Sequence, residues 1–371
     1  MRLYRYIVPG LVVQAVMVGG GYATGRELVE FFLSKGPATA LAGLALTALL
    51  ISTGAVVSFE LARQYLAFDY KSFCRVFLGR FWVLFEIGYY ALLVLVLSVL
   101  SAAAGKLLAQ MAGLPELTNS ILFIVVVAFV VFFGNTVIEK VISAWSVLFY
   151  ATYGAMFAMV LLKFGPELRT ALHASAFDWP EAVRDSFSYT GYNVVILPIL
   201  IFVARNFESR ADALIAGMVA GPLILLPGLA SLLALSAFYP SILNEPLPIS
   251  VVLGNIGHPV LATCVQLVIL GAFVKTGVGL LHGLNERIAR AATDRGRTLP
   301  RAFRPIAALV ILVVTVFVAS AVGIIDLIGR GYRYSSYFFL LIFFFPLLLR
   351  GTWLVVRGSG GARVRPEVIP S

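Results

Sequence analysis

The sequence is poor in charged side chains, which make up only 12% of its 371 residues. Soluble globular domains carry about 25% charged residues. Hydrophobic residues, in contrast, make up 60% of the chain, and its mean hydropathy is +0.97. This composition excludes an ordinary soluble domain and predicts an all-α protein that crosses the lipid bilayer many times.

Cysteine and histidine are scarce, with two and three copies respectively. Cys74 and Cys264 lie far apart in the sequence, so no disulfide framework is expected. His173, His258 and His282 are also scattered, which argues against a metal site built on histidine and cysteine. We therefore predict neither a metal nor a cofactor.

Common enzyme motifs are missing as well. The chain contains no Gly-x-Ser-x-Gly, no His-Glu-x-x-His and no phosphate-binding Gly-x-x-x-x-Gly-Lys-Ser/Thr. Its net charge of +10 is not gathered into a basic cluster with interleaved aromatic residues, so no nucleic-acid partner is expected. The sequence thus favours a membrane protein that is not an enzyme.

Long apolar segments dominate the chain, and each is long enough to cross a bilayer. We count ten, at 6–34, 38–65, 81–112, 119–136, 140–164, 184–205, 211–239, 257–290, 303–321 and 335–357. Lysine and arginine concentrate in the segments that share a side with both termini. The positive-inside rule then predicts that both termini are cytoplasmic.

The longest outer connection divides these spans into two halves of five, which we expect to be structural repeats at 1–165 and 166–358. A repeat with an odd number of spans must be inserted upside down relative to its copy. The short basic tail at 359–371 is expected to be disordered and cytoplasmic. Inverted repeats predict matching interruptions in spans 1 and 6.

Span 1 contains such an interruption, made by Gly19, Gly20, Gly21, Tyr22, Ala23, Thr24 and Gly25. Each glycine costs roughly 1 kcal/mol of helix propensity, and unwound backbone at membrane depth must be satisfied by protein or by a cavity. We expect the backbone of Gly19 to Tyr22 to face a binding cavity. The half-helix that begins near Thr24 would attract an anion such as a carboxylate. The alternative is a helix-packing role, because Gly21 and Gly25 have small-xxx-small spacing.

Span 6 is interrupted by Tyr189, Thr190, Gly191, Tyr192 and Asn193, with Pro198 further along. Tyrosine rings can wall a pocket, while hydroxyl and amide groups donate and accept hydrogen bonds. We predict that these five residues form the second half of the substrate site. An interfacial aromatic belt is the alternative for the tyrosines.

Charged residues inside spans form two further candidates. Lys275 lies at the centre of 257–290, where a lysine is costly and usually has a partner or a task. It would carry a proton or act as a fixed positive charge in place of a bound cation. A structural ion pair with Glu60 or Glu86 is the alternative.

Arg26, Glu27 and Glu30 follow the glycine run. Glu27 and Glu30 are three residues apart and share a helix face. They lie on the outer half of span 1, where we expect a vestibule or gate. The alternative is an exposed helix end.

These features resemble the amino acid–polyamine–organocation superfamily, whose members have the leucine-transporter fold, and most closely the YkvI-type bacterial membrane proteins. Three motifs carry the resemblance: Gly19-Gly20-Gly21-Tyr22-Ala23-Thr24-Gly25-Arg26-Glu27, Tyr192-Asn193, and Gly283-Leu284-Asn285-Glu286-Arg287. YkvI-type chains look like Gly-Ala-Gly-Phe-Ala-Ser/Thr-Gly-Gln-Glu at the first motif. Arg26 stands where they have glutamine.

The resemblance implies a bacterial inner-membrane protein with five-plus-five inverted repeats and a substrate between broken spans 1 and 6 and spans 3 and 8. In sodium-coupled members, a cation lies between the break in span 1 and span 8. Carried over to this chain, that position belongs to Lys275 and Thr276. A lysine ammonium there disfavours sodium and favours proton coupling or uncoupled exchange.

Together, the sequence predicts a secondary transporter, such as a symporter, that moves a small amino acid or a related amine-bearing solute by alternating access. The coupling ion would be a proton or sodium, and the sequence does not specify an oligomeric state. The alternative is a non-transporting sensor or receptor subunit on the same fold, which spore-germinant receptors resemble.

Overall fold

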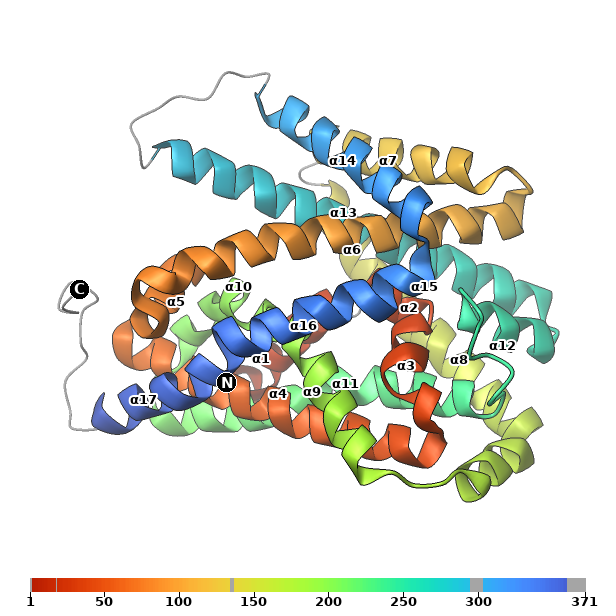
Figure 1. The fold of residues 1–371 in the computed structure, drawn as a ribbon, viewed down its shortest axis with the longest axis horizontal. Helices are drawn as coiled ribbons and strands as arrows, with labels where there is room; N and C mark the ends of the chain where they lie inside the picture. Colours follow the sequence, from red (N-terminus) through yellow and green to blue (C-terminus); the bar gives the residue numbers. More distant parts are fainter. Residues whose placement is uncertain (1, 18, 134–136, 294–302, 359–371) are drawn as a thin grey trace.

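The computed structural model describes residues 2–17, 19–133, 137–293 and 303–358, and these ranges contain helices and no strands (Figure 1). Long helices lie alongside one another across the molecule. Two short helices, α5 (Tyr70–Leu78) and α17 (Thr352–Gly358), lie at one end, and α12 (Pro248–Ile256) lies at the other. The predicted all-α membrane fold is confirmed.

Six helical segments in the described ranges are long and apolar enough to cross a membrane. They comprise α4 (Pro37–Tyr65), α6 (Trp82–Ala112) together with α5, the part Leu148–Ala174 of α8 (Val137–Ala174), α11 (Arg210–Ser236), the part Pro259–Leu281 of α13 (Pro259–Thr293) and the run Ile324–Gly358. The helices α7 (Glu116–Phe133) and α14 (Phe303–Val322) add two shorter apolar ones. The remaining two spans are the first and the sixth, whose helices are shorter because both spans are broken.

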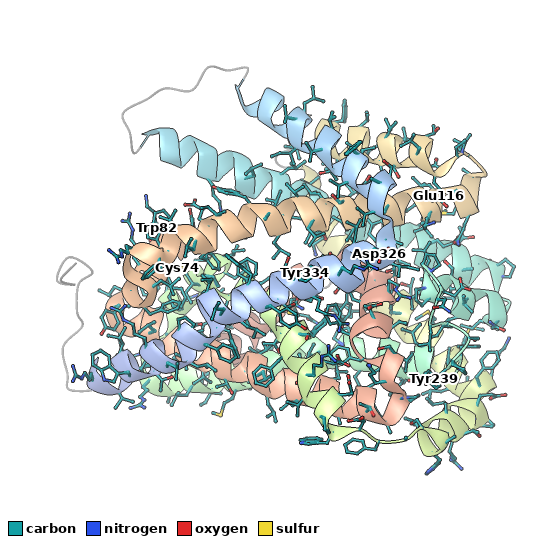
Figure 2. All side chains as sticks on the ribbon, viewed as in Figure 1. Cys74, Trp82, Glu116, Tyr239, Asp326 and Tyr334 are labelled. Carbon is teal, nitrogen blue, oxygen red and sulfur yellow. The ribbon has the colours of Figure 1, made fainter. Side chains whose placement is uncertain are left out.

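The outer surface of these helices is apolar. Large hydrophobic side chains such as Leu162 (85% exposed), Phe317 (71%) and Leu341 (68%) point away from the protein. A soluble monomer rarely exposes extended apolar surface of this kind, whereas lipid tails cover it without cost. Figure 2 shows Cys74 and Trp82 at one end of the molecule and Glu116 at the other.

The helices pack in two groups. In the first, α4 packs on α11 and α9 (Trp179–Asn193), and α1 (Arg2–Met17) packs on α11. In the second, α6, α7, α13 and α14 pack on one another, and α8 contacts both α11 and α13. The short helix α2 (Gly20–Ala23) touches α6 and α13. The interruption of span 1 therefore lies where the two groups meet.

Glycines on α11 allow this helix to cross α4 at close range. A Cβ added to Gly217 would lie 2.6 Å from both the backbone nitrogen and the Cα of Val56 on α4. Four residues along, the backbone nitrogen of Gly221 donates to the Ser52 hydroxyl at 3.2 Å. Small residues spaced in this way let helix backbones approach within a membrane.

Replacing Gly217 by alanine is expected to destabilise the protein by about 1–3 kcal/mol, because the new methyl group meets backbone that cannot move aside. The melting temperature in detergent would fall. Gly154→Ala on α8 is the matched control, since a Cβ there meets nothing within 4 Å. Equal melting temperatures for the two variants would contradict the packing role of Gly217.

Some boundaries differ from the sequence expectation. The helix α8 continues to Ala174 instead of ending near 164, with a kink at Phe164 (φ −125°, ψ 23°) just before Pro166. Pro166 has no N–H to donate to the Leu162 carbonyl and its ring clashes with the preceding turn, so the helix kinks there without ending. The short helices α5 and α12 were not predicted, because both are too short to form an apolar span. The tail 359–371 lies outside the described residues.

Candidate functional site

Span 1 is divided into three helices. The helix α1 ends at Met17, α2 is a single turn, and α3 (Arg26–Phe31) begins after Gly25. Gly25 has φ +78°, a left-handed conformation that L side chains rarely adopt and that glycine takes at little cost. The backbone is therefore interrupted on both sides of α2, within the predicted stretch.

The carbonyl groups at this break are hydrogen-bonded to protein. The Gly21 carbonyl accepts from the Thr24 hydroxyl at 2.8 Å, and the Tyr22 carbonyl accepts from the Gly25 N–H at 3.1 Å. The Ala23 carbonyl accepts from the Tyr153 hydroxyl of α8. The Thr24 carbonyl accepts from the Ile249 N–H of α12 at 3.1 Å.

The expectation that the backbone of Gly19 to Tyr22 faces a cavity stays a prediction, while in this structure donors within the chain bond the Gly21 and Tyr22 carbonyls. The physical reason is that an unbonded carbonyl inside the membrane is costly, and nearby donors satisfy it. Two of the donors at the break come from α8 and α12, so both elements hold the broken end of span 1.

Span 6 breaks just after the predicted motif. Tyr189 to Asn193 form the last turn of α9, and the helical bonding changes at Val194 before α10 (Ile196–Ile199) and η3 (Ile201–Asn206). Pro198 has no N–H to donate to the Val194 carbonyl, which instead accepts from Leu197 at 3.0 Å. The proline thus fixes the position of the break.

The two broken spans are joined by Glu27 and Tyr192. The Tyr192 hydroxyl donates to Glu27 Oε2 at 2.8 Å, and both side chains are buried. The other carboxylate oxygen lies against Gly21, where an added Cβ would overlap it. A glycine at position 21 therefore makes room for the Glu27 carboxylate at the break.

Aromatic rings surround this contact. The Tyr192 ring centroid lies 4.7 Å from Tyr332 of η4 (Leu327–Tyr332), 5.5 Å from Phe31 and 5.5 Å from Tyr189. The buried hydroxyls of Tyr22, Tyr189 and Thr190 have no hydrogen-bond partner in the described chain. Buried hydroxyls are usually paired, so three unpaired ones near one break mark a candidate polar site.

Other predicted site residues have structural contacts. A Cβ on Gly191 would lie 2.6 Å from the Ser336 carbonyl oxygen of α16 (Arg333–Phe339), so this glycine lets span 6 pack on span 10. The Asn193 amide donates to the Tyr189 carbonyl at 2.9 Å. The Thr24 hydroxyl, besides its bond to Gly21, accepts from the Arg26 N–H at 3.3 Å at the start of α3.

Arg26 ties α3 to its neighbours towards the α12 end. Its guanidinium donates to the carbonyls of Leu243 at 2.6 Å and Glu245 at 3.2 Å, and it pairs with Glu30 at 2.5 Å. Arg333 of α16 also approaches Glu30, at 3.7 Å. Arg26 is only 3% exposed, so the exposed-helix-end alternative does not hold for it. These contacts close the break on one side.

Ion pairs also hold the other end of span 1, at α1. Arg5 of α1 pairs with Glu208, and its second nitrogen lies 3.8 Å from Asp212 at the start of α11. They fasten the first half of span 1 to α11, at the opposite end of span 1 from Arg26. The break therefore lies between two sets of ion pairs.

Lys275 and Thr276 lie on α13, which contacts α2, and both side chains are partly buried. The carboxylates considered as alternative partners for Lys275 have other contacts. Glu60 pairs with Arg63 at 2.7 Å, and Glu86 accepts from Tyr70 at 2.8 Å. The described residues contain no group of three or more His, Cys, Asp or Glu that could hold a metal ion.

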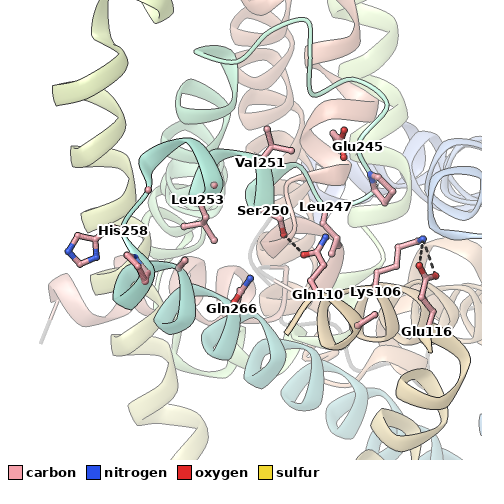
Figure 3. Close-up of a pocket in the computed structure, with 16 residues that line it drawn as sticks. Lys106, Gln110, Glu116, Glu245, Leu247, Ser250, Val251, Leu253, His258 and Gln266 are labelled. Atoms are coloured by element: carbon pink, nitrogen blue, oxygen red, sulfur yellow. Dashed lines mark hydrogen bonds and ion pairs between the residues drawn. The ribbon is translucent and has the colours of Figure 1, made fainter. Parts of the chain in front are cut away.

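A separate open cavity of about 830 Å³ lies beside α12 (Figure 3). Residues of α6, α7, α12 and α13 line it, and none comes from α2, α3 or α9. Lys106 and Glu116 form an ion pair at 3.0 Å on its wall, and Ser250 donates to Gln110 at 2.9 Å. Its wall includes Glu245, whose carbonyl binds Arg26, so the cavity adjoins the segment that closes the break.

No protein-family model and no curated protein matches the sequence, whereas solved structures do match. MhsT in complex with L-phenylalanine has a TM-score of 0.62 at 16% identity, covering 96% of this chain and 97% of MhsT. A single-residue mutant of the Eremococcus coleocola manganese transporter has a TM-score of 0.60 at 16% identity, covering 96% and 83%. Mhp1 in an inward-facing conformation has a TM-score of 0.52 at 14% identity, covering 88% and 76%.

The chain has the leucine-transporter fold. This fold explains why spans 1 and 6 are the broken ones and why they meet between two groups of helices. Fold alone does not define a substrate.

The sequence analysis missed several residues at this site. Tyr153, Tyr332 and Arg333 come from α8, η4 and α16, far along the chain from either break. The sequence signal for Tyr153 was its position as a polar hydroxyl group in the middle of an apolar span. No local pattern places Tyr332 or Arg333 at the break, because only the packing of span 10 brings them there.

Proposed function

We propose that this chain is a secondary transporter that moves a small amino acid or a related amine-bearing solute across a bacterial inner membrane by alternating access. One observation carries the proposal: the broken ends of spans 1 and 6 are joined by the Glu27–Tyr192 hydrogen bond at the meeting point of two helix groups. Discontinuous helices near the bilayer midplane are where secondary transporters bind their substrates.

The predicted site residues enter the proposal in three roles. The stretches Gly19–Gly25 and Tyr189–Asn193 bind the solute, and Arg26, Glu27 and Glu30 form the gate region. Lys275, beside Thr276 on α13, takes the place of a sodium ion and links solute occupancy to a proton. The halves 1–165 and 166–358 are the inverted repeats, and both termini are cytoplasmic. The proteins that share this function are the YkvI-type members of the amino acid–polyamine–organocation superfamily.

Uptake into liposomes tests this function. The purified protein should accumulate a labelled amino acid or amine under an imposed proton gradient, and the accumulation should collapse when a protonophore dissipates the gradient. Liposomes without protein are the control. Solute binding without flux would instead support a sensor or receptor subunit, and a broad amino-acid and amine panel with neither binding nor flux would refute the proposed substrate class.

Arg26→Gln is expected to loosen the closed side of the break, because the glutamine cannot pair with Glu30 while also reaching the Leu243 and Glu245 carbonyls. A cysteine placed at Thr24, with Cys74 and Cys264 replaced, should then react several-fold faster with a membrane-impermeant thiol reagent. Arg184→Gln is the control, since Arg184 is exposed and its ion pair with Glu181, at 3.6 Å, lies within α9. Equal labelling rates in the two variants would argue against a gate at Arg26.

A further inference from the structure

Glu27 differs from the other deeply buried acidic groups in its partners. The Glu60 carboxylate binds Arg63 and Gln64, each at 2.7 Å. Asp212 accepts two backbone N–H bonds, from Glu208 at 3.0 Å and Ser209 at 3.1 Å. Glu27 accepts only the Tyr192 hydroxyl and forms no ion pair with any lysine, arginine or histidine in the described part of the chain.

Its sequence neighbour Arg26 does not compensate the charge. The Arg26 guanidinium is directed at Glu30 and at the carbonyls beside α12. A buried carboxylate is costly unless a positive charge and hydrogen-bond donors offset the lost hydration. Within the described part of the chain, no positive charge offsets the burial of the Glu27 carboxylate.

The surroundings of Glu27 suit an organic ammonium group. The rings of Tyr189 and Tyr332 pack against the ring of Tyr192, whose hydroxyl donates to Glu27, and ring faces attract cations. The unpaired hydroxyls of Tyr22 and Tyr189 offer acceptors for its N–H groups. A metal ion fits less well, because metal sites use several acidic or imidazole ligands, and the described residues gather no such group around Glu27.

We propose that Glu27 binds the ammonium group of the transported solute, and that this solute is an amine without a carboxylate next to its amino group. A neighbouring carboxylate would be brought against the negative charge of Glu27, where like charges repel in a low-dielectric environment. The inference rests on the proposed solute-binding role of the break. It narrows the substrate class from amino acids and amines to amines.

Matched pairs of ligands test the inference directly. We would measure binding of phenethylamine and L-phenylalanine, and of isobutylamine and L-valine, to the purified full chain by calorimetry and by thermal shift. Each pair differs only in the carboxylate. The wild-type protein should bind at least one amine, and bind it at least about tenfold more tightly than its amino acid.

Glu27→Gln is the deciding variant, since it keeps the shape of the side chain and removes its charge. Loss of one partner of a buried charge pair should weaken amine binding about thirtyfold or more. Glu60→Gln is the matched control, because Glu60 is also a buried glutamate but its carboxylate is bound by Arg63 and Gln64. Its amine affinity should stay within about threefold of wild type, and far-ultraviolet circular dichroism establishes that both variants are folded.

Three outcomes would overturn the inference: wild-type protein that binds no amine of the panel, preference for the amino acid in both pairs, or unchanged amine affinity in Glu27→Gln. The last result would mean that Glu27 holds a proton and acts as a neutral group. Glu27-dependent amine binding without flux would refute transport and leave the binding of an ammonium group by Glu27 intact. Flux of an amino acid that is unchanged in Glu27→Gln would support transport and refute the inference.

Discussion

Gly21→Ala is expected to abolish solute binding and uptake while the protein still inserts and folds. The added methyl group would overlap the Glu27 carboxylate, which must then leave its position beside the break and its hydrogen bond to Tyr192. Misplacing a binding group by about 1 Å can cost on the order of a hundredfold in activity. Uptake into liposomes and ligand-induced thermal shift would measure the loss.

Gly279→Ala serves as the control for this substitution, because a Cβ at Gly279 on α13 meets nothing within 4 Å. It should retain wild-type uptake and gain slightly in helix stability. If Gly21→Ala also transports at the wild-type rate, the Glu27 carboxylate is free to move aside, and its position against Gly21 has no functional role.

Lys275→Ala is expected to uncouple transport from the proton gradient. The substitution removes a positive charge from α13, the helix that contacts α2, where we propose that it replaces a coupling cation. Gradient-driven accumulation should fall to the level of passive exchange, while exchange of external for internal solute continues. Counterflow and gradient-driven uptake, measured on the same liposomes, separate the two effects.

Lys106→Ala is the control for charge removal, since the Lys106 ammonium pairs with Glu116 at 3.0 Å on the wall of the separate cavity. That variant should keep its response to the gradient. Should Lys275→Ala accumulate solute as wild type does, Lys275 has no part in coupling. Sodium-stimulated uptake that appears only in Lys275→Ala would directly support the replacement of a cation by the lysine.

The broken spans show which features of the site local sequence patterns can predict. Glycine propensity and Pro198 act locally, so the interruptions in spans 1 and 6 could be predicted within a few residues of their observed positions. Local propensity could not predict which groups satisfy the broken backbone. The Ile249 N–H and the Tyr153 hydroxyl come from α12 and α8, more than a hundred residues along the chain.

Glu27 shows that local sequence patterns are equally limited in predicting the contacts of a functional residue. Its spacing from Glu30 predicted a shared helix face in a vestibule or gate, and Glu30 does pair with Arg26 there. Glu27 instead lies against Gly21 and Tyr192. The turn at Gly25 brings Gly21 of α2 against Glu27, and a helical wheel drawn through an unbroken span cannot predict that contact.

The sequence by itself determined the membrane class, the all-helical fold and the approximate positions of the breaks, because hydropathy and helix propensity are properties of neighbouring residues. Only the tertiary structure decided which side chains meet at the break. Helix packing brings three groups to the break: the ring of Tyr332, the guanidinium of Arg333 and the Ile249 N–H of α12. Such contacts depend on how spans distant in sequence cross in space, and no local pattern encodes that.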